Sequence, residues 1–177
     1  RVIMNGIADI DESTRISRLF RDIPMGNICG GADVPNMREV IHQKMEEEGM
    51  HCSDIRNHEV RDRKVNRDDI KLKIKENKES YSKEYFISMV SYKDNIEIEE
   101  NRVLHGFVRL RLPYMDRDMK EEWISEIADC ALIREVHVYG KLNPTFKNFK
   151  SLEYNQHKGL GKEMIKESEK IALENGR

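Results

Sequence analysis

The chain has 177 residues and a formal net charge of −2, and its charged and hydrophobic residues amount to 36% and 38%. This composition excludes a disordered chain and is typical of a globular protein with a strongly hydrated surface. No apolar run approaches the roughly 20 residues that cross a bilayer, and the small net charge excludes a global electrostatic attraction for nucleic acid.

The first third of the chain is predicted to contain a helix between loops. Residues 1–24 combine Asp, Ser and Thr start signals with a short apolar segment that ends at Pro24, and paired glycines followed by Pro35 indicate a loop. A helix is predicted between Asn36 and Gly49, because the apolar residues there fall at helical spacing. These residues are Met37, Val40, Ile41 and Met45.

The stretch from Arg56 to Lys83 is locally basic, with ten Lys or Arg against six Asp or Glu. Such an excess fits contact with a phosphate backbone. An ordinary hydrated surface is an equally good interpretation, so the stretch alone does not predict a nucleic-acid partner.

From about residue 69 the apolar residues alternate with polar ones, which predicts strands of an antiparallel meander. The alternating sets are Ile70, Leu72 and Ile74; Phe86, Val90 and Tyr92; and Val108, Leu110 and Leu112, the last interleaved with Arg109 and Arg111. A further strand is predicted in the segment IREVHVYG. Its alternation places Val136 and Val138 on one face and Glu135, His137 and Tyr139 on the other.

The segment QHKGLGK, residues 156–162, precedes a predicted helix. Amides at a helix start have no partner inside the helix and carry a partial positive charge, and glycines let a bulky anion approach them. The letters do not fit a Walker loop, because Lys162 is followed by Glu163. They do not fit a Rossmann fingerprint either, because Met164 stands where a third glycine is needed.

The helix after this turn is predicted to bury one face, consisting of Leu160, Met164, Ser168, Ile171 and Ala172, and an Asn-Gly pair predicts its C-cap. Lysines at 158, 162, 166 and 170 form a line at i, i+4 spacing. The two at the helix start oppose the helix dipole by about 0.3–1 kcal/mol each, which a bound anion would offset. For Lys166 and Lys170, hydrated side chains balanced by neighbouring glutamates are an equally good interpretation.

Strands followed by a glycine turn and a helix predict an α+β fold, with the helix packed on a sheet. A strand of the VHV type that leads into Q-x-x-G-x-G resembles the coenzyme cradle of the Gcn5-related acetyltransferase family, whose sheet is mixed and mostly antiparallel with flanking helices. In that family the strand pairs with the pantetheine arm of acetyl-CoA, and the turn holds its pyrophosphate. The resemblance implies that the arm is lined by Glu135, Val136, His137 and Val138, and that the pyrophosphate is held by Gln156, His157, Lys158, Gly159, Leu160 and Gly161.

Further segments resemble the family of the catalytic subunit of Elongator, in the right order and over nearly the full chain. They are RLFRDIP, NMRE after a glycine pair, DIRNHEV, GFVRLRLP, REVHVYG and QHKGLG. The resemblance implies that residues 1–65 are the end of a radical-SAM domain with a helical linker. It implies that residues 66–177 are an acetyltransferase domain that lacks its last strands. The chain is therefore expected to be cut at both ends.

This family carboxymethylates the wobble uridine (U34) of tRNA to 5-carboxymethyluridine, so the resemblance implies a radical-SAM acyltransferase that uses acetyl-CoA. S-adenosylmethionine and a [4Fe-4S] cluster are implied for the full-length protein, with ligands outside this chain, so the fragment alone is expected to be inactive. The implied partners are tRNA and either other Elongator subunits or a second copy, without membrane or DNA. The expected location is the cytoplasm, with the nucleus as a second place. No catalytic residue is identified.

No metal is predicted in this chain. The three cysteines, Cys29, Cys52 and Cys130, have no repeated spacing, which indicates reduced thiols and no zinc site. Prokaryotic members of the family carry a linker C-x-C-x-x-C, of which only Cys52 is kept here. His51 and His58 are too loosely spaced around it to indicate a ligand set. His137 is predicted to be a residue of the cofactor strand and not a general base, since no nucleophile or carboxylate partner is visible in the sequence.

Two other functions stay open. A stand-alone acetyltransferase for protein or small-molecule amines would share the coenzyme cradle but leave the first 65 residues unexplained. A non-catalytic tRNA-binding and assembly module would instead depend on the basic stretch from Arg56 to Lys83.

Overall fold

The computed structural model describes residues 1–19, 25–31, 36–114, 127, 129–140 and 159–177, and these fall into two compact units, Arg1–His58 and Glu59–Arg177. Among the described residues, no helix has both the length and the apolar character that a membrane crossing requires.

The first unit is helical, with α1 (Val2–Ala8), a 3-10 turn η1 (Met25–Asn27), α2 (Met37–Glu47) and α3 (Ile55–His58). Its core joins Met4 and Ile7 of α1 to Ile41 and Met45 of α2, with Cys52 beside them. The helix predicted between Asn36 and Gly49 is confirmed, and two of its four predicted apolar residues form the buried face. Helix α1 was not predicted, because one apolar pair three residues apart gives little periodicity to detect.

A buried carboxylate fixes the extended segment 14–17 against α2 and α3. Asp54 is fully buried, accepts a hydrogen bond from the amide of Ile16 at 2.8 Å and forms an ion pair with Arg38. The next amide, of Ile55, donates to the carbonyl of Thr14 at 3.0 Å. Because a buried charge is costly unless it is paired and hydrogen-bonded, Arg38 and the Ile16 amide hold Asp54 in one position.

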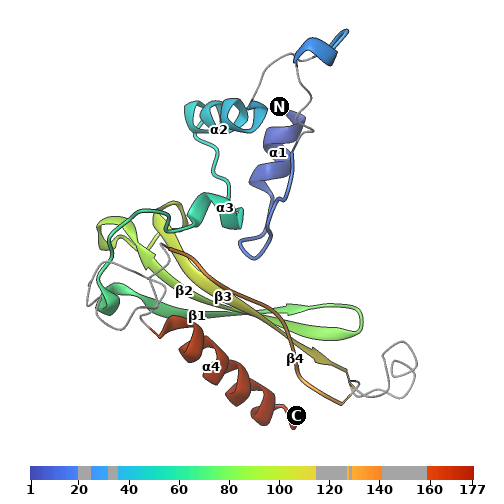
Figure 1. The fold of residues 1–177 in the computed structure, drawn as a ribbon, viewed down its shortest axis with the longest axis vertical. Coiled ribbons are helices and arrows are strands. Elements are labelled where there is room, and N and C mark those ends of the chain that lie inside the picture. Colours follow the sequence, from blue (N-terminus) through green and yellow to red (C-terminus); the bar gives the residue numbers. More distant parts are fainter. Residues whose placement is uncertain (20–24, 32–35, 115–126, 128, 141–158) are drawn as a thin grey trace. The chain divides into compact units, whose positions relative to one another are not determined.

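The second unit is an antiparallel sheet with a helix on one face, as predicted (Figure 1). Its strands are β1 (Lys71–Lys78), β2 (Ser82–Tyr92), β3 (Arg102–Pro113) and β4 (Leu132–Val138), in the order β1-β2-β3-β4. The 3-10 turns η2 (Arg67–Asp69), η3 (Lys93–Asn95) and η4 (Glu99–Asn101) lie between strands or before them. The helix α4 (Leu160–Glu174) packs on the face that carries Ile87, Val108 and Leu110.

Helix α4 buries the predicted face. Leu160, Met164, Ser168 and Ile171 are all buried, and the hydroxyl of Ser168 is satisfied by the carbonyl of Met164 at 2.8 Å. The predicted C-cap is confirmed at Asn175, followed by Gly176 with φ +71°. The apolar spacing of this helix thus determines which side meets the sheet.

Residues 59–65, which the sequence analysis grouped with the first part of the chain, pack in the second unit. Glu59 bridges to Leu104 of β3, and the amide of Val60 donates to the Leu104 carbonyl at 2.9 Å. Val60 is fully buried, and Val65 packs against the core under α4. The contacts therefore divide the chain after His58, and the assignment of the two parts to radical-SAM and acetyltransferase domains stays a prediction.

Candidate functional site

Strand β4 is paired on one side only in the part of the chain that the structure describes. It pairs with β3, and no described strand pairs with its other edge. An unpaired edge presents a row of backbone donors and acceptors that an extended ligand can use as a neighbouring strand would. The strand that the sequence predicted to line the coenzyme arm is therefore an edge of the sheet formed by the described residues.

The two faces of β4 are as predicted. Val136 and Val138 pair in register with Val108 and Gly106 of β3, and Val138 packs on the core under α4. On the opposite face, the ring of His137 stacks on Phe107 at 6.0 Å between centroids. Val136 is 44% exposed and lies on the α4 face, so it is an apolar surface available beside the open edge.

A β-bulge interrupts β4 at Arg134. Arg109 pairs with Glu135 and Leu110 pairs with Ile133, so Arg134 has no residue opposite it. Bulges bend a strand and often lie beside active sites. Arg134 forms an ion pair with Glu84 of β2, and this contact holds the extra residue on the face opposite α4.

Glu84 is the centre of a charge cluster that the sequence analysis did not predict. Its side chain is 7% exposed and contacts Arg109 at 3.4 Å, Arg111 at 3.2 Å and Arg134. Burial alone would raise the pKa of Glu84, but hydrogen bonds and charges from Arg134 and Arg111 outweigh it and lower the pKa. The cluster ties β2, β3 and β4 together behind the open edge, and only the alternation of charges in GFVRLRLP and IREVHV hinted at it.

At the start of α4, three amides have no acceptor among the described residues. Gly159 precedes the helix with φ +77° and ψ 7°, and no side chain caps it. The first helical backbone bond runs from the amide of Glu163 to the carbonyl of Gly159 at 3.0 Å, so the amides of residues 160–162 have no acceptor within the described chain. They converge at the positive end of a 15-residue helix, which is the geometry of an anion site.

The helix start and the open strand are neighbours. A Cβ placed on Gly161 would lie 3.3 Å from Cγ2 of Val138, so the glycine allows α4 to begin directly against β4. A Cβ on Gly106 would lie 2.7 Å from the His137 carbonyl and 3.1 Å from Cε of Met164. Two glycines thus let β3, β4 and α4 approach one another at the point where the amides and the edge meet.

The structure describes seven of the predicted site residues, and among them Val138 of β4 lies against Gly161 at the start of α4. The seven are Glu135, Val136, His137, Val138, Gly159, Leu160 and Gly161. Gln156, His157 and Lys158 lie outside the described residues. Leu160 is 1% exposed and contributes its amide, while its side chain is in the core. Glu135 forms an ion pair with Arg109 at 3.1 Å and points away from α4.

The lysine line on α4 is partly neutralised. Lys170 pairs with Glu167 at 3.2 Å, which raises its pKa through the hydrogen bond and charge of that carboxylate. Glu163 pairs with Arg67. The hydrated interpretation is therefore confirmed for Lys170, and Lys162 stays beside the free amides at the helix start.

Among the described residues no group of three His, Cys, Asp or Glu side chains is arranged to hold a metal ion. The His51 and His58 rings lie 5.4 Å apart, and Nε2 of His58 is within 3.2 Å of the Cys52 carbonyl. Burial raises the pKa of the Cys52 thiol.

A four-stranded antiparallel sheet with α4 packed on one face defines an acetyltransferase-type α+β fold. No family model matches the chain. It is 35% identical over 167 residues to the tRNA uridine(34) acetyltransferase of Methanocaldococcus jannaschii, covering 90% of the chain and 28% of that protein. It is 32% identical over 165 residues to Elongator complex protein 3 of Saccharomyces cerevisiae, covering 91% of the chain and 28% of that protein.

A solved structure of the archaeal Elp3 of Methanocaldococcus infernus, with an N-terminal deletion, superposes with a TM-score of 0.75 and 30% identity, over 98% of this chain and 39% of that one. The chain therefore belongs to the family of the Elongator catalytic subunit. It spans somewhat more than a quarter of the length of the curated relatives that it matches.

Proposed function

We propose that the chain is the coenzyme-binding part of an enzyme that modifies the wobble uridine of tRNA, with acetyl-CoA as the acyl donor. The names of its relatives support tRNA uridine(34) as the substrate and acetyl transfer as the reaction type. The observation that carries the coenzyme assignment is that α4 begins directly against Val138 of β4, with amides that have no acceptor among the described residues and a strand that is paired on one side only among them.

The residues fit the coenzyme in two ways. The amides of residues 160–162, at the positive end of α4, suit the pyrophosphate, because a helix N-terminus carries roughly half an elementary charge. The edge of β4 suits the two amides of the pantetheine arm, which can pair with it as an added strand, and the half-exposed Val136 offers an apolar contact. Acetyl-CoA, when bound, supplies an acetyl group activated as a thioester.

The finer parts of the function belong to the same proposal. They are the formation of 5-carboxymethyluridine, the use of S-adenosylmethionine and a [4Fe-4S] cluster by the full-length protein, tRNA as a direct partner, and assembly with other Elongator subunits or a second copy. The cytoplasm is the proposed location. Gln156, His157 and Lys158 are proposed to complete the pyrophosphate site.

The two ends of α4 provide a matched test of the coenzyme site. Gly159 and Gly176 have φ values of +77° and +71°, and a Cβ at either meets nothing within 4 Å, so Gly159→Glu and Gly176→Glu carry similar backbone strain. Only the first places a carboxylate beside the free amides. Calorimetric titration with coenzyme A should show at least a tenfold weaker affinity, about 1.4 kcal/mol, for Gly159→Glu and an unchanged affinity for Gly176→Glu.

The same variants separate coenzyme binding from RNA binding. Filter binding of an unmodified tRNA transcript should be unchanged in Gly159→Glu and in Gly161→Glu. Equal coenzyme affinities for the two matched glycine variants would contradict the assignment of the helix start to the pyrophosphate.

A further inference from the structure

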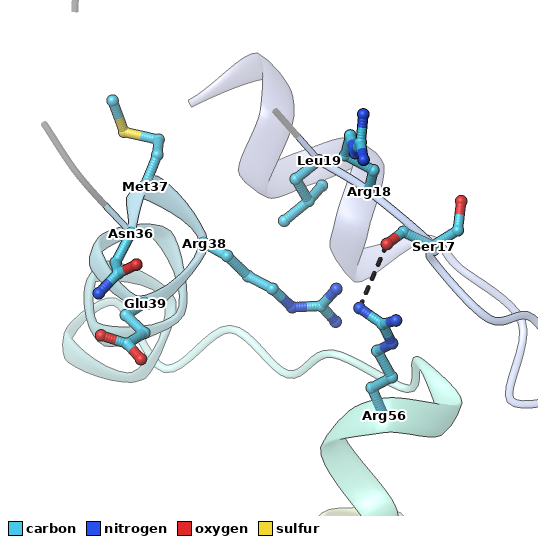
Figure 2. Close-up of a pocket in the computed structure, with 8 residues that line it drawn as sticks. All are labelled: Ser17, Arg18, Leu19, Asn36, Met37, Arg38, Glu39 and Arg56. Atoms are coloured by element: carbon cyan, nitrogen blue, oxygen red, sulfur yellow. Dashed lines mark hydrogen bonds between the residues drawn. The ribbon is translucent and has the colours of Figure 1, made fainter. Parts of the chain in front are cut away.

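The first unit contains a cavity of about 390 Å³ whose lining is rich in positively charged side chains. Its lining comes from residues 17–19, the start of α2 and α3: Ser17, Arg18, Leu19, Asn36, Met37, Arg38, Glu39 and Arg56 (Figure 2). Three of these eight residues are arginines and one is acidic. This group could not be predicted from the sequence, because its arginines are separated by 20 and 18 positions.

Two of the arginines donate to consecutive backbone carbonyls. Arg38 donates from Nη1 to the carbonyl of Ile16 at 3.2 Å, and Arg56 donates from Nη1 to the next carbonyl, of Ser17, also at 3.2 Å. Figure 2 shows both guanidinium groups pointing to the same part of the cavity, while Glu39 points away from them. Like charges in this arrangement repel one another unless anions offset them.

The described residues offset only part of this charge. Asp54 pairs with Arg38, but Arg56 has no ion pair within the described part of the chain. Arg18 adds a third, exposed cation to the lining. Because Asp54 is fully buried and is itself hydrogen-bonded, Arg38 is fixed before any ligand arrives, so little side-chain entropy is lost on binding.

The start of α2 adds backbone donors to the same cavity. Asn36 has φ +57° and makes no side-chain cap, and the first backbone bond runs from the amide of Glu39 to the Asn36 carbonyl at 2.8 Å. The amides of Met37 and Arg38 therefore have no acceptor among the described residues. The positive start of this 11-residue helix thus lines the same cavity as the arginines.

We propose that this cavity binds a phosphate group, and that the phosphate belongs to an RNA backbone. Guanidinium forks and backbone amides together are the donors that proteins use for phosphate, and contacts of this type fix the register of a nucleic acid without reading its bases. The cavity is large enough to admit a phosphate with part of its sugar. The choice of RNA as the source rests on the proposed function; the phosphate site itself does not.

Arg56 is the side chain to change, because removing Arg38 would leave Asp54 buried without its partner. Arg56→Gln removes one positive charge from the cavity, and Arg15→Gln removes one from an exposed position of the same unit that does not line it. Inorganic phosphate, compared with chloride at equal ionic strength, should raise the melting temperature of the wild type and of Arg15→Gln. Arg56→Gln should bind phosphate at least fivefold more weakly, and Arg56→Lys should recover part of the loss.

Binding of an unmodified tRNA transcript at several salt concentrations identifies the source of the phosphate. The plot of log affinity against log salt has a negative slope, and in Arg56→Gln this slope should become shallower by about 0.7–0.9, the amount expected for the loss of one phosphate contact. In Arg15→Gln the slope should stay unchanged. Loss of phosphate binding with an unchanged tRNA slope would keep the phosphate site and overturn RNA as its source. The site would be overturned if phosphate did not raise the melting temperature of the wild type, or if it raised that of both glutamine variants equally. Coenzyme A affinity should be unchanged in every variant, so failure here is distinct from failure of the coenzyme site.

Discussion

Replacing Glu84 by glutamine tests whether the buried charge cluster holds β4 in place. Glu84 is 7% exposed and faces Arg109, Arg111 and Arg134, whose side chains are 16%, 26% and 44% exposed. A hydrogen bond to a charged group contributes about 1.5–3 kcal/mol, and a half-exposed partner such as Arg134 contributes at most about 1 kcal/mol. Glutamine keeps one acceptor oxygen, so we expect a loss of about 2–3 kcal/mol in the free energy of unfolding.

The direction of the pKa shift of Glu84 determines how the stability difference between the wild type and Glu84→Gln changes with pH. Because the pKa of Glu84 lies below its ordinary value in the folded state, its contribution is complete above the unfolded value of about 4.3. It is lost as the pH falls through the lower folded value. The wild type and Glu84→Gln should therefore differ most near pH 7 and converge in acid.

Urea denaturation followed by circular dichroism at pH 7 and at lower pH values measures this difference. At neutral pH the variant should also melt about 5–10 °C lower, given roughly 2–4 °C per kcal/mol for a chain of this size. Glu100→Gln, at an exposed position without a described ion pair, is the control and should change stability by less than about 0.5 kcal/mol. A Glu84→Gln deficit that is small, or that persists undiminished in acid, would refute the reasoning.

Three further predictions concern packing and thiol access. Gly106→Ala should cost about 1–3 kcal/mol in urea denaturation and weaken coenzyme A binding, since its Cβ would meet the His137 carbonyl at 2.7 Å, whereas Gly26→Ala, in open space, should do neither. Met164→Ala should cost about 2–5 kcal/mol in the same assay, because the side chain is fully buried under the sheet; a loss below 1 kcal/mol would contradict that packing. In a thiol-reagent titration at pH 8, Cys29 and Cys130 should react rapidly and Cys52 only after addition of urea, because Cys52 is buried and its pKa is raised by burial; three equal rates would be inconsistent with the fold.

Periodicity explains what could be predicted from the sequence. Helix α2, the meander of strands and the buried face of α4 all follow from local spacing, because a helix or strand repeats its apolar residues within a few positions. The glycine turn was also predictable, because Gly159 and Gly161 stand together at the start of a predicted helix, where glycines let an anion approach the backbone amides. These features depend on neighbours in the chain.

The features that could not be predicted depend on residues far apart in the chain. Glu84 meets Arg134 across 50 positions, and the cavity of the first unit joins residues 17–19, 36–39 and 56. The bulge at Arg134 is a matter of register between β3 and β4, which alternation within either strand does not reveal. Residues 59–65 have no strong periodicity, so their packing beside β3 was not apparent either.

The geometry of the candidate coenzyme site depends on the core more than on local caps. Among the described residues no side chain caps α4, so the direction of the amides of residues 160–162 is set by the helix as a whole. That helix is oriented by Leu160, Met164 and Ile171, which are buried against β2 and β3. The open edge of β4 is placed by the same sheet, through Gly106 on one face and Glu84 on the other. Substitutions in the core should therefore weaken coenzyme binding and stability together, whereas Gly159→Glu should weaken binding while losing no more stability than its strained control, Gly176→Glu.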